Sequence, residues 1–147
     1  GDTVSMMKVW KDYGVDRKLR EMYKKDAAVL GGVSAGAICW FDSGHSDSES
    51  FSRKEGWNYI FAEGMLGIHP YVLCPHYNEE GRDSFDEMMK EKQLVGLALE
   101  NEAAFVEKDG TITFIRSRKD ARAYEIIYRE GKLRKKELSF EDGALDE

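Results

Sequence analysis

The stretch AAVLGGVSAGAICWF, residues 27–41, decides the fold. Its first part, residues 27–33, is almost entirely apolar, which is the pattern of a strand buried on both faces of a parallel sheet. The apolar character continues through residues 34–41, where we expect a buried helix. A buried strand that leads directly into a helix predicts an α/β fold with a parallel sheet and flanking helices.

The junction between this expected strand and helix contains a candidate nucleophile. Residues 32–36, GVSAG, match the pattern G-x-S-x-G, in which a sharp turn exposes the serine at the top of the sheet. Small neighbours let the strand and the helix approach closely while the serine backbone is held under strain. Ser34 is therefore the expected nucleophile, and the Ala35 amide is the expected donor to the oxyanion of acyl transfer. The alternative interpretation is a tight turn with an inert serine.

A serine hydroxyl needs a base within hydrogen-bonding reach, and the chain has three histidines. His76 follows the apolar segment 65–73, which is expected to end in a strand, and parallel α/β sheets form their sites at the carboxyl ends of strands. We therefore expect His76 to be the base. His45 lies in the polar stretch 42–55, which we expect to be a loop and a wall of the site. His69 lies in the same segment, ahead of the expected strand, and is predicted to be a structural or surface residue.

The base in turn needs an acceptor that orients its ring. Asp47 and Glu49 both lie in the polar stretch between the nucleophile and the base. Asp47 is the preferred candidate, and Glu49 and Glu100 are the alternatives. Most acidic residues in such a stretch are merely solvated.

Two amphipathic helices are expected before this region and antiparallel hairpins after it. Thr3 or Ser5 is predicted to cap the first helix and Gly14 to end it, and Asp16 is predicted to cap the second. The later elements are a helix containing Phe85, Met88 and Met89, a strand over 95–99, and hairpins over 103–106 with 111–115 and over 124–128 with 133–138. The acidic end, 141–147, is expected to fray.

Composition narrows the class of protein. The 147 residues fit one domain, and a net charge of −6 disfavours nucleic acid and anionic membrane surfaces as partners. No apolar run reaches the roughly 18 residues that span a bilayer, and no signal peptide opens the chain, so we expect a cytoplasmic protein. The two cysteines lie in apolar contexts and are expected to pack as small hydrophobic residues. The start at Gly1 suggests a fragment or a processed chain.

A metal centre is not expected. The side chains that could contribute to one, His45, Asp47, Cys74 and His76, have no standard ligand spacing. We therefore predict neither a metal nor another cofactor.

Three segments together resemble the peptidase E family of serine peptidases, family S51, which includes the aspartyl dipeptidase and, more distantly, cyanophycinase. They are GGVSAGAICWF at 31–41, GHSDS at 44–48 and CPHYN at 74–78. The resemblance begins at GDT, residues 1–3, which is similar to the end of the family's Gly-Gly-Asn-Thr segment. It implies a class I glutamine amidotransferase-like fold, a three-layer αβα sandwich with a parallel sheet, as one catalytic domain over 1–147. Because family members usually have a longer amino-terminal part, we expect this portion to be missing.

The resemblance also implies roles for particular residues. Ser34 and His76 correspond to the nucleophile and the base, and Asp47 is similar to the third member of the triad. The region of Gly1 corresponds to the second oxyanion donor. Arg82 is in a position similar to that of the arginine that binds the acidic side chain of the substrate, for which a guanidinium is suited because it binds carboxylates bidentately. The alternative is that Arg82 starts a surface helix.

The function implied by the resemblance is hydrolysis of short peptides, including dipeptides with an amino-terminal Asp, by a monomer or a homodimer. Two alternatives stay open from the sequence. One is an amidase or esterase of the same fold that acts on another small substrate. The other is a non-catalytic binding protein that has kept the fold.

Overall fold

The computed structural model describes residues 1–51 and 58–141. The chain divides into two compact units, Gly1–Cys74 and Pro75–Glu147, and each is described by itself. Among the described residues, no helix is long and apolar enough to cross a membrane. The single catalytic domain over residues 1–147 stays a prediction.

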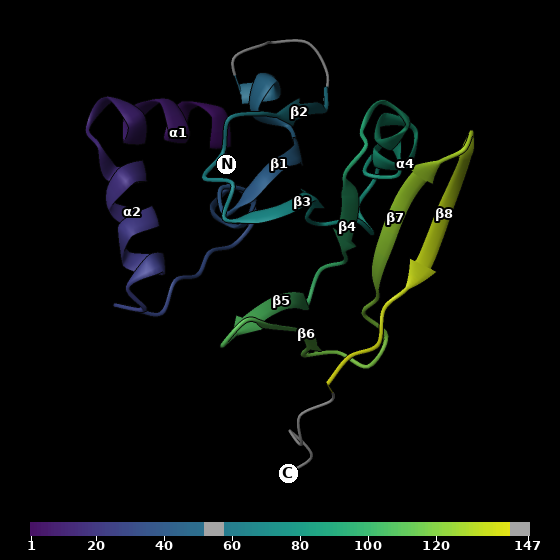
Figure 1. Cartoon of the computed structure of the whole chain (residues 1–147). Coiled ribbons are helices and arrows are strands. Elements are labelled where there is room, and N and C mark those ends of the chain that lie inside the picture. Colours follow the sequence, from purple (N-terminus) through teal and green to yellow (C-terminus); the bar gives the residue numbers. More distant parts are fainter. Residues whose placement is uncertain (52–57, 142–147) are drawn as a thin grey trace. The chain divides into compact units, whose positions relative to one another are not determined.

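The first unit combines helices with a small sheet (Figure 1). Strand β1 pairs with β2 in antiparallel and with β3 in parallel orientation. In chain order the elements are α1 (Thr3–Asp12), α2 (Val15–Lys24), α3 (Ala35–Ile38), β1 (Phe41–Ser46), the 3₁₀ helix η1 (Ser48–Phe51), β2 (Ile60–Ala62) and β3 (His69–Cys74).

The start of α1 differs from the prediction. Asp2 caps the helix, because its carboxylate accepts hydrogen bonds from the Ser5 amide at 3.0 Å and the Ser5 hydroxyl at 2.6 Å. The Ser5 hydroxyl bond is the main reason that the pKa of Asp2 is lowered. The expected cap by Thr3 or Ser5 was therefore wrong, since Thr3 lies inside α1 and is fully buried. Gly14 separates the two helices as expected and, rather than Asp16, occupies the N-cap of α2 with a φ of 72°.

Residues 27–33 do not form the predicted buried strand. They have no regular secondary structure, and Val29 and Val33 are 101% and 82% exposed. A strand needs neighbours that satisfy its backbone amides and carbonyls, and none of the described strands pairs with these residues. Apolar composition alone therefore predicted the wrong secondary structure for residues 27–33. The expected buried helix over 34–41 is also shorter than predicted and contains only α3.

The polar stretch from residue 42 is not simply a loop. Strand β1 includes its first five residues, and His45 is fully buried there with its ring stacked on Tyr59 at 4.5 Å between centroids. The Sγ atom of Cys74 lies 3.6 Å from His45 Nδ1. Polarity did not prevent burial because these side chains find partners inside the unit. His45 is therefore not an exposed wall residue, and positions 52–55 of the stretch lie outside the described residues.

Gly44 explains how β1 packs under α3. A Cβ atom at this position would lie 2.5 Å from Cγ2 of Ile38, closer than real side chains approach. The glycine thus lets α3 lie directly on the strand. Gly44 belongs to the stretch that was expected to be a loop, whereas in the structure it permits close packing.

The second unit begins with a turn region and ends in hairpins (Figure 1). Strand β4 pairs with β7, β7 pairs with β8, and β5 pairs with β6, all in antiparallel orientation. Its elements are α4 (Ser84–Met88), the 3₁₀ helix η2 (Met89–Glu91), β4 (Val95–Leu99), β5 (Ala103–Lys108), β6 (Thr111–Arg116), β7 (Ala123–Arg129) and β8 (Lys132–Glu137). The predicted strand over 95–99 and both predicted hairpins are confirmed.

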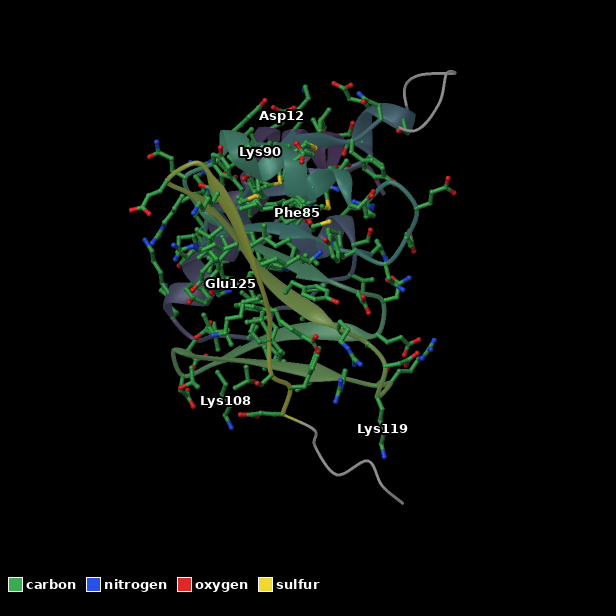
Figure 2. All side chains as sticks on the ribbon, turned by 90° about the vertical axis from the view of Figure 1, so that its right-hand side faces the viewer. Asp12, Phe85, Lys90, Lys108, Lys119 and Glu125 are labelled. Atoms are coloured by element: carbon green, nitrogen blue, oxygen red, sulfur yellow. The ribbon has the colours of Figure 1, made fainter. Side chains whose placement is uncertain are left out.

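The core of the second unit forms where α4 and η2 lie on β4. A Cβ atom at Gly96 would lie 2.9 Å from Phe85 and 3.1 Å from Met89, and both of these side chains are fully buried. Ile126 of β7, the register partner of Gly96, is also fully buried. Figure 2 shows Phe85 among the interior side chains, with Lys108 and Lys119 on the outside.

Helices, a parallel strand pair and C-terminal hairpins together define an α/β fold. The fold is consistent with the class I glutamine amidotransferase-like class that the sequence predicted. The α/β prediction is therefore confirmed, although several of its individual elements are not.

Candidate active site

Ser34 occupies a strained turn immediately before α3. Its backbone has φ 57° and ψ −116°. Residues other than glycine rarely adopt this combination, which costs them about 1–3 kcal/mol. The Ser34 carbonyl accepts hydrogen bonds from the amides of Ala37 at 2.9 Å and Ile38 at 3.0 Å, which fix the turn. The side chain is half-buried. Strain of this kind is typical of a nucleophile that the backbone must present to a substrate.

The glycine two positions before Ser34 permits this turn. A Cβ atom at Gly32 would lie 1.9 Å from the carbonyl oxygen of Gly36, whereas one at Gly31 would meet no atom within 4 Å. The backbone on the two sides of Ser34 therefore approaches more closely than any side chain allows. This is the geometric reason for the first glycine of the motif.

The two expected oxyanion donors are neighbours in the first unit. A Cβ atom at Gly1 would lie 3.5 Å from the Cβ atom of Ala35. The hydroxyl of the buried Thr3 donates a hydrogen bond to the Ala35 carbonyl at 3.1 Å, which ties the start of the chain to the turn. As the first residue of α3, Ala35 has an amide without an acceptor inside the helix.

Both cysteines are buried thiols, as the sequence predicted. The Cys39 thiol donates to the Gly36 carbonyl at 3.2 Å. Burial raises the pKa of Cys39 from 9.0 to about 11. Its thiol is therefore not a competing nucleophile at neutral pH.

The raised pKa of Cys39 predicts a loss of stability in alkali. In the unfolded chain this thiol ionises at a lower pH than in the folded chain, so the free energy of unfolding is unaffected below pH 9 and falls as the pH rises from 9 to about 11. Urea unfolding of the wild type and Cys39→Ala at about pH 8 and about pH 10.5 checks this. The alkaline loss should be smaller in the variant, and an equal loss in both would assign it to other groups.

His76 lies two residues beyond the end of β3, as expected for a residue after a strand. Its φ is 57°, a left-handed conformation that turns the chain sharply. Its Nδ1 atom lies 2.5 Å from Oδ1 of Asn101 and 3.6 Å from Oε1 of Glu79. About a quarter of the side chain, 27%, is exposed. The ring is thus held on one edge.

The sequence analysis did not identify Asn101 or Glu79. Asn101 follows β4 by two residues, a position where the rule of strand carboxyl ends could have found it. The Tyr77 amide donates to the Leu99 carbonyl at 2.9 Å and so joins the His76 turn to the end of β4. This non-local bond has no signature in the sequence.

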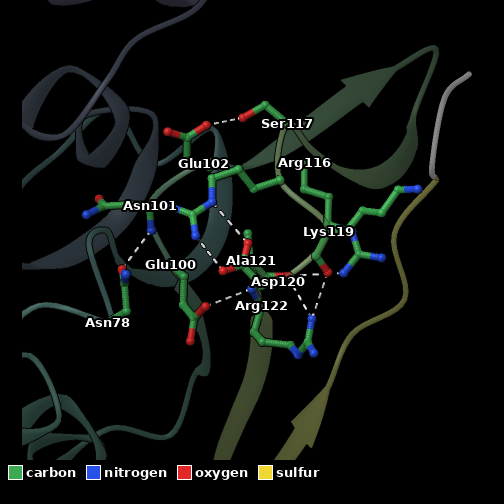
Figure 3. Close-up of polar contacts among 11 residues, drawn as sticks. Asn78, Glu100, Asn101, Glu102, Arg116, Ser117, Lys119, Asp120, Ala121 and Arg122 are labelled. Atoms are coloured by element: carbon green, nitrogen blue, oxygen red, sulfur yellow. Dashed lines mark hydrogen bonds and ion pairs between the residues drawn. The ribbon is translucent and has the colours of Figure 1, made fainter. Parts of the chain in front are cut away.

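The expected orienting acids have different surroundings. Asp47 lies in the first unit between β1 and η1, and its carbonyl accepts from the Ser50 amide at 2.8 Å. Glu49 accepts from the Asn58 side chain at 3.0 Å. Glu100 accepts from the Arg122 amide at 2.8 Å (Figure 3). The role of Asp47 as the third catalytic residue stays a prediction.

Arg82 is only 3% exposed. It precedes α4, its amide donates to the Glu79 carbonyl at 3.2 Å, and its carbonyl accepts from the Phe85 amide at 3.1 Å. The alternative that Arg82 starts a surface helix is therefore wrong. Its role in binding a carboxylate stays a prediction.

Within the described ranges, 1–51 and 58–141, no group of three or more His, Cys, Asp or Glu side chains is arranged to hold a metal ion. The groups that could take part in catalysis are instead Ser34 in the first unit and His76, with its neighbours Asn101 and Glu79, in the second.

Comparison with known proteins gives two findings. The family model of peptidase family S51 matches residues 1–115. A curated relative, the uncharacterized peptidase YgaJ of Bacillus subtilis (strain 168), is 33% identical over 135 residues, which cover 88% of this chain and 54% of the relative. The chain therefore spans about half the length of that relative. The search of solved structures found no match to this chain.

Proposed function

Because the chain belongs to peptidase family S51, we propose that it supplies the nucleophile and the base of a serine peptidase. The observation that supports this most directly is the backbone of Ser34, with φ 57° and ψ −116° at the entry to α3. An inert turn gains nothing from placing a side chain in that region, where glycine would avoid the strain.

In the proposed reaction the Ser34 hydroxyl attacks the carbonyl carbon of a peptide bond. The imidazole of His76 accepts the hydroxyl proton and then gives it to the departing amine, which leaves an acyl-serine. The Ala35 amide, with the backbone near Gly1, stabilises the negative oxygen of the tetrahedral intermediate. A water molecule then attacks the acyl-serine with the same histidine as base, and the acid product leaves.

The proposed substrates are short peptides, including dipeptides with an amino-terminal Asp. Arg82 is the proposed partner of the acidic side chain, since a guanidinium remains charged when it is buried and binds a carboxylate through two parallel hydrogen bonds. The same proposal includes a cytoplasmic location and either a monomer or a homodimer. It also includes Asp47 as the third catalytic residue.

A fluorophosphonate probe tests this function. It reacts with activated serines, so we expect it to label the wild type at Ser34, as read by mass spectrometry of the digested protein, and not after heat denaturation. A panel of Asp-containing dipeptides, other peptides, simple amides and esters then follows. Labelling together with cleavage of amides or esters alone would indicate the amidase or esterase alternative. Absence of labelling would indicate a non-catalytic protein.

A further inference from the structure

Tyr77 follows His76 directly, and its side chain is held by two other elements of the second unit. Its hydroxyl donates a hydrogen bond to Asp86 Oδ1 of α4 at 2.8 Å and accepts one from Lys135 Nζ of β8. The same ammonium lies 3.4 Å from Asp86 Oδ2. We propose that Lys135 is a positioning residue, which acts on the base His76 through the hydroxyl of Tyr77. This inference rests on the proposed function and specifies what holds its base in place.

The register of β8 explains why Lys135 reaches into this unit. Strand β8 lies beside β7, and Lys135 is opposite Ile126, which is fully buried (Figure 1). Residues directly opposite each other in an antiparallel pair share a face of the sheet, so Lys135 points to the face on which the core lies. The next residue, Lys136, is opposite Glu125 and points to the other face.

Two aromatic rings and a carboxylate together restrict the ammonium to one place. Lys135 Nζ lies 4.5 Å from the ring centroid of Tyr77 and 4.7 Å from that of Tyr124, and the two rings meet edge to face at 5.6 Å. Ring faces attract cations at such distances. The side chains of Lys135 and Asp86 are 37% and 22% exposed, so their ion pair alone would be weakened by solvent. The combination of contacts therefore holds the ammonium, rather than the ion pair.

The turn at His76 needs such support. Its φ of 57° is a conformation that residues other than glycine keep only where their surroundings hold them. The Tyr77 amide donates to the Leu99 carbonyl at 2.9 Å, which fixes the backbone, and the Tyr77 side chain is only 9% exposed. Lys135 adds the second restraint, at the far end of the same side chain. It lies in the C-terminal hairpin, beyond the part of the chain that matches the family model.

NMR spectroscopy of the histidine rings tests the inference without any turnover, and a His76→Gln variant assigns the signals. Lys135→Met keeps an unbranched side chain but removes the charge and the donor, so the ring signals of His76 should shift. Lys136→Met, the matched control on the opposite face of β8, should leave them unchanged. His69, whose ring contacts Phe41 in the other unit, is the internal control and should not change in either variant.

Tyr77→Phe separates positioning from a direct effect of the charge. This variant removes the hydroxyl that Lys135 contacts and keeps the ring. If Lys135 acts through the hydroxyl, Lys135→Met should shift the His76 signals much less in the Tyr77→Phe background than in the wild type. A direct electrostatic effect on His76 would be equal in the two backgrounds. Lys135→Arg, which keeps a cation and hydrogen-bond donors, should retain the wild-type signals.

If the chain is active, the same variants should separate kcat from KM. A base that is no longer held in place slows the chemical step without weakening substrate binding. Lys135→Met should therefore lower kcat for Asp-p-nitroanilide by about 10-fold, within the roughly 10²-fold that a displacement of about 1 Å can cost, and leave KM unchanged. Lys135→Arg should recover most of the rate.

Two results would overturn the inference: wild-type His76 signals in folded Lys135→Met, or equal shifts in the two backgrounds. Where urea unfolding shows that Lys135→Met does not fold, Tyr77→Phe alone decides, and unchanged His76 signals in that variant would overturn the inference as well. The failure of the proposed function is a separate result. In that case the coupled shifts of His76 are observed, but no substrate is cleaved and the fluorophosphonate probe does not label Ser34.

Discussion

Replacing Ser34 with alanine is expected to lower kcat/KM for Asp-p-nitroanilide by about 10⁵- to 10⁶-fold, the scale of loss when a serine protease loses its nucleophile. Without the hydroxyl no acyl-enzyme forms, and only binding and the oxyanion donors remain to assist water. The measurement is release of p-nitroaniline by the wild type and by Ser34→Ala. Ser139→Ala, at an exposed serine of the second unit, is the control and should retain full activity.

A second replacement at the same position separates chemistry from folding. Ser34→Gly also removes the hydroxyl, but glycine adopts a φ of 57° without strain. It should therefore be inactive and yet at least as resistant to urea as the wild type. Hydrolysis by Ser34→Ala at the wild-type rate would remove Ser34 from the mechanism, whatever the stability of the variants.

The C-terminal hairpins could be predicted from the sequence because their turns are local. Asp109 and Gly110 have φ values of 53° and 77°, and Glu130 and Gly131 have 52° and 73°. Two consecutive positive φ values define the type I′ turn, and a glycine at its second position is a strong signal in the sequence. The register of each hairpin follows from the turn alone.

Strand β1 and residues 27–33 could not be predicted in this way because both depend on distant neighbours. The polar residues of β1 form a strand since β2 and β3 pair with it on its two sides. The apolar residues 27–33 look more suited to a strand, but no described strand pairs with them. Side-chain composition is a weaker determinant of a strand than the availability of pairing partners.

The candidate site was predictable to the extent that its signals were local. Ser34 was found through the glycine pattern around it, and His76 through its position after a strand. Asn101 was missed because its contact with His76 joins residues 25 positions apart. The sequence analysis considered the adjacent Glu100, so the correct region was in view. Which of the two side chains faces the ring depends on the backbone after β4.

Gly32→Ala is expected to damage both the fold and the site, whereas Gly31→Ala, one position earlier, should do little. The added methyl group of the first variant would lie 1.9 Å from the Gly36 carbonyl oxygen, and that of the second would meet nothing within 4 Å. The oxygen belongs to the backbone of α3, so the clash cannot be relieved by rotating a side chain. We expect Gly32→Ala to lower the free energy of unfolding by about 1–3 kcal/mol, and Gly31→Ala to change it by less than about 0.5 kcal/mol.

The effect of Gly32→Ala on the site should exceed its effect on stability. Moving the backbone before Ser34 releases the strained turn, and the hydroxyl then no longer has a fixed direction relative to the Ala35 amide. Displacements of about 1 Å can reduce catalysis about 10²-fold. Fluorophosphonate labelling and urea unfolding of the two variants, measured side by side, give both quantities. Equal behaviour of the two variants would show that the close approach of Gly32 to Gly36 does not hold the nucleophile in place.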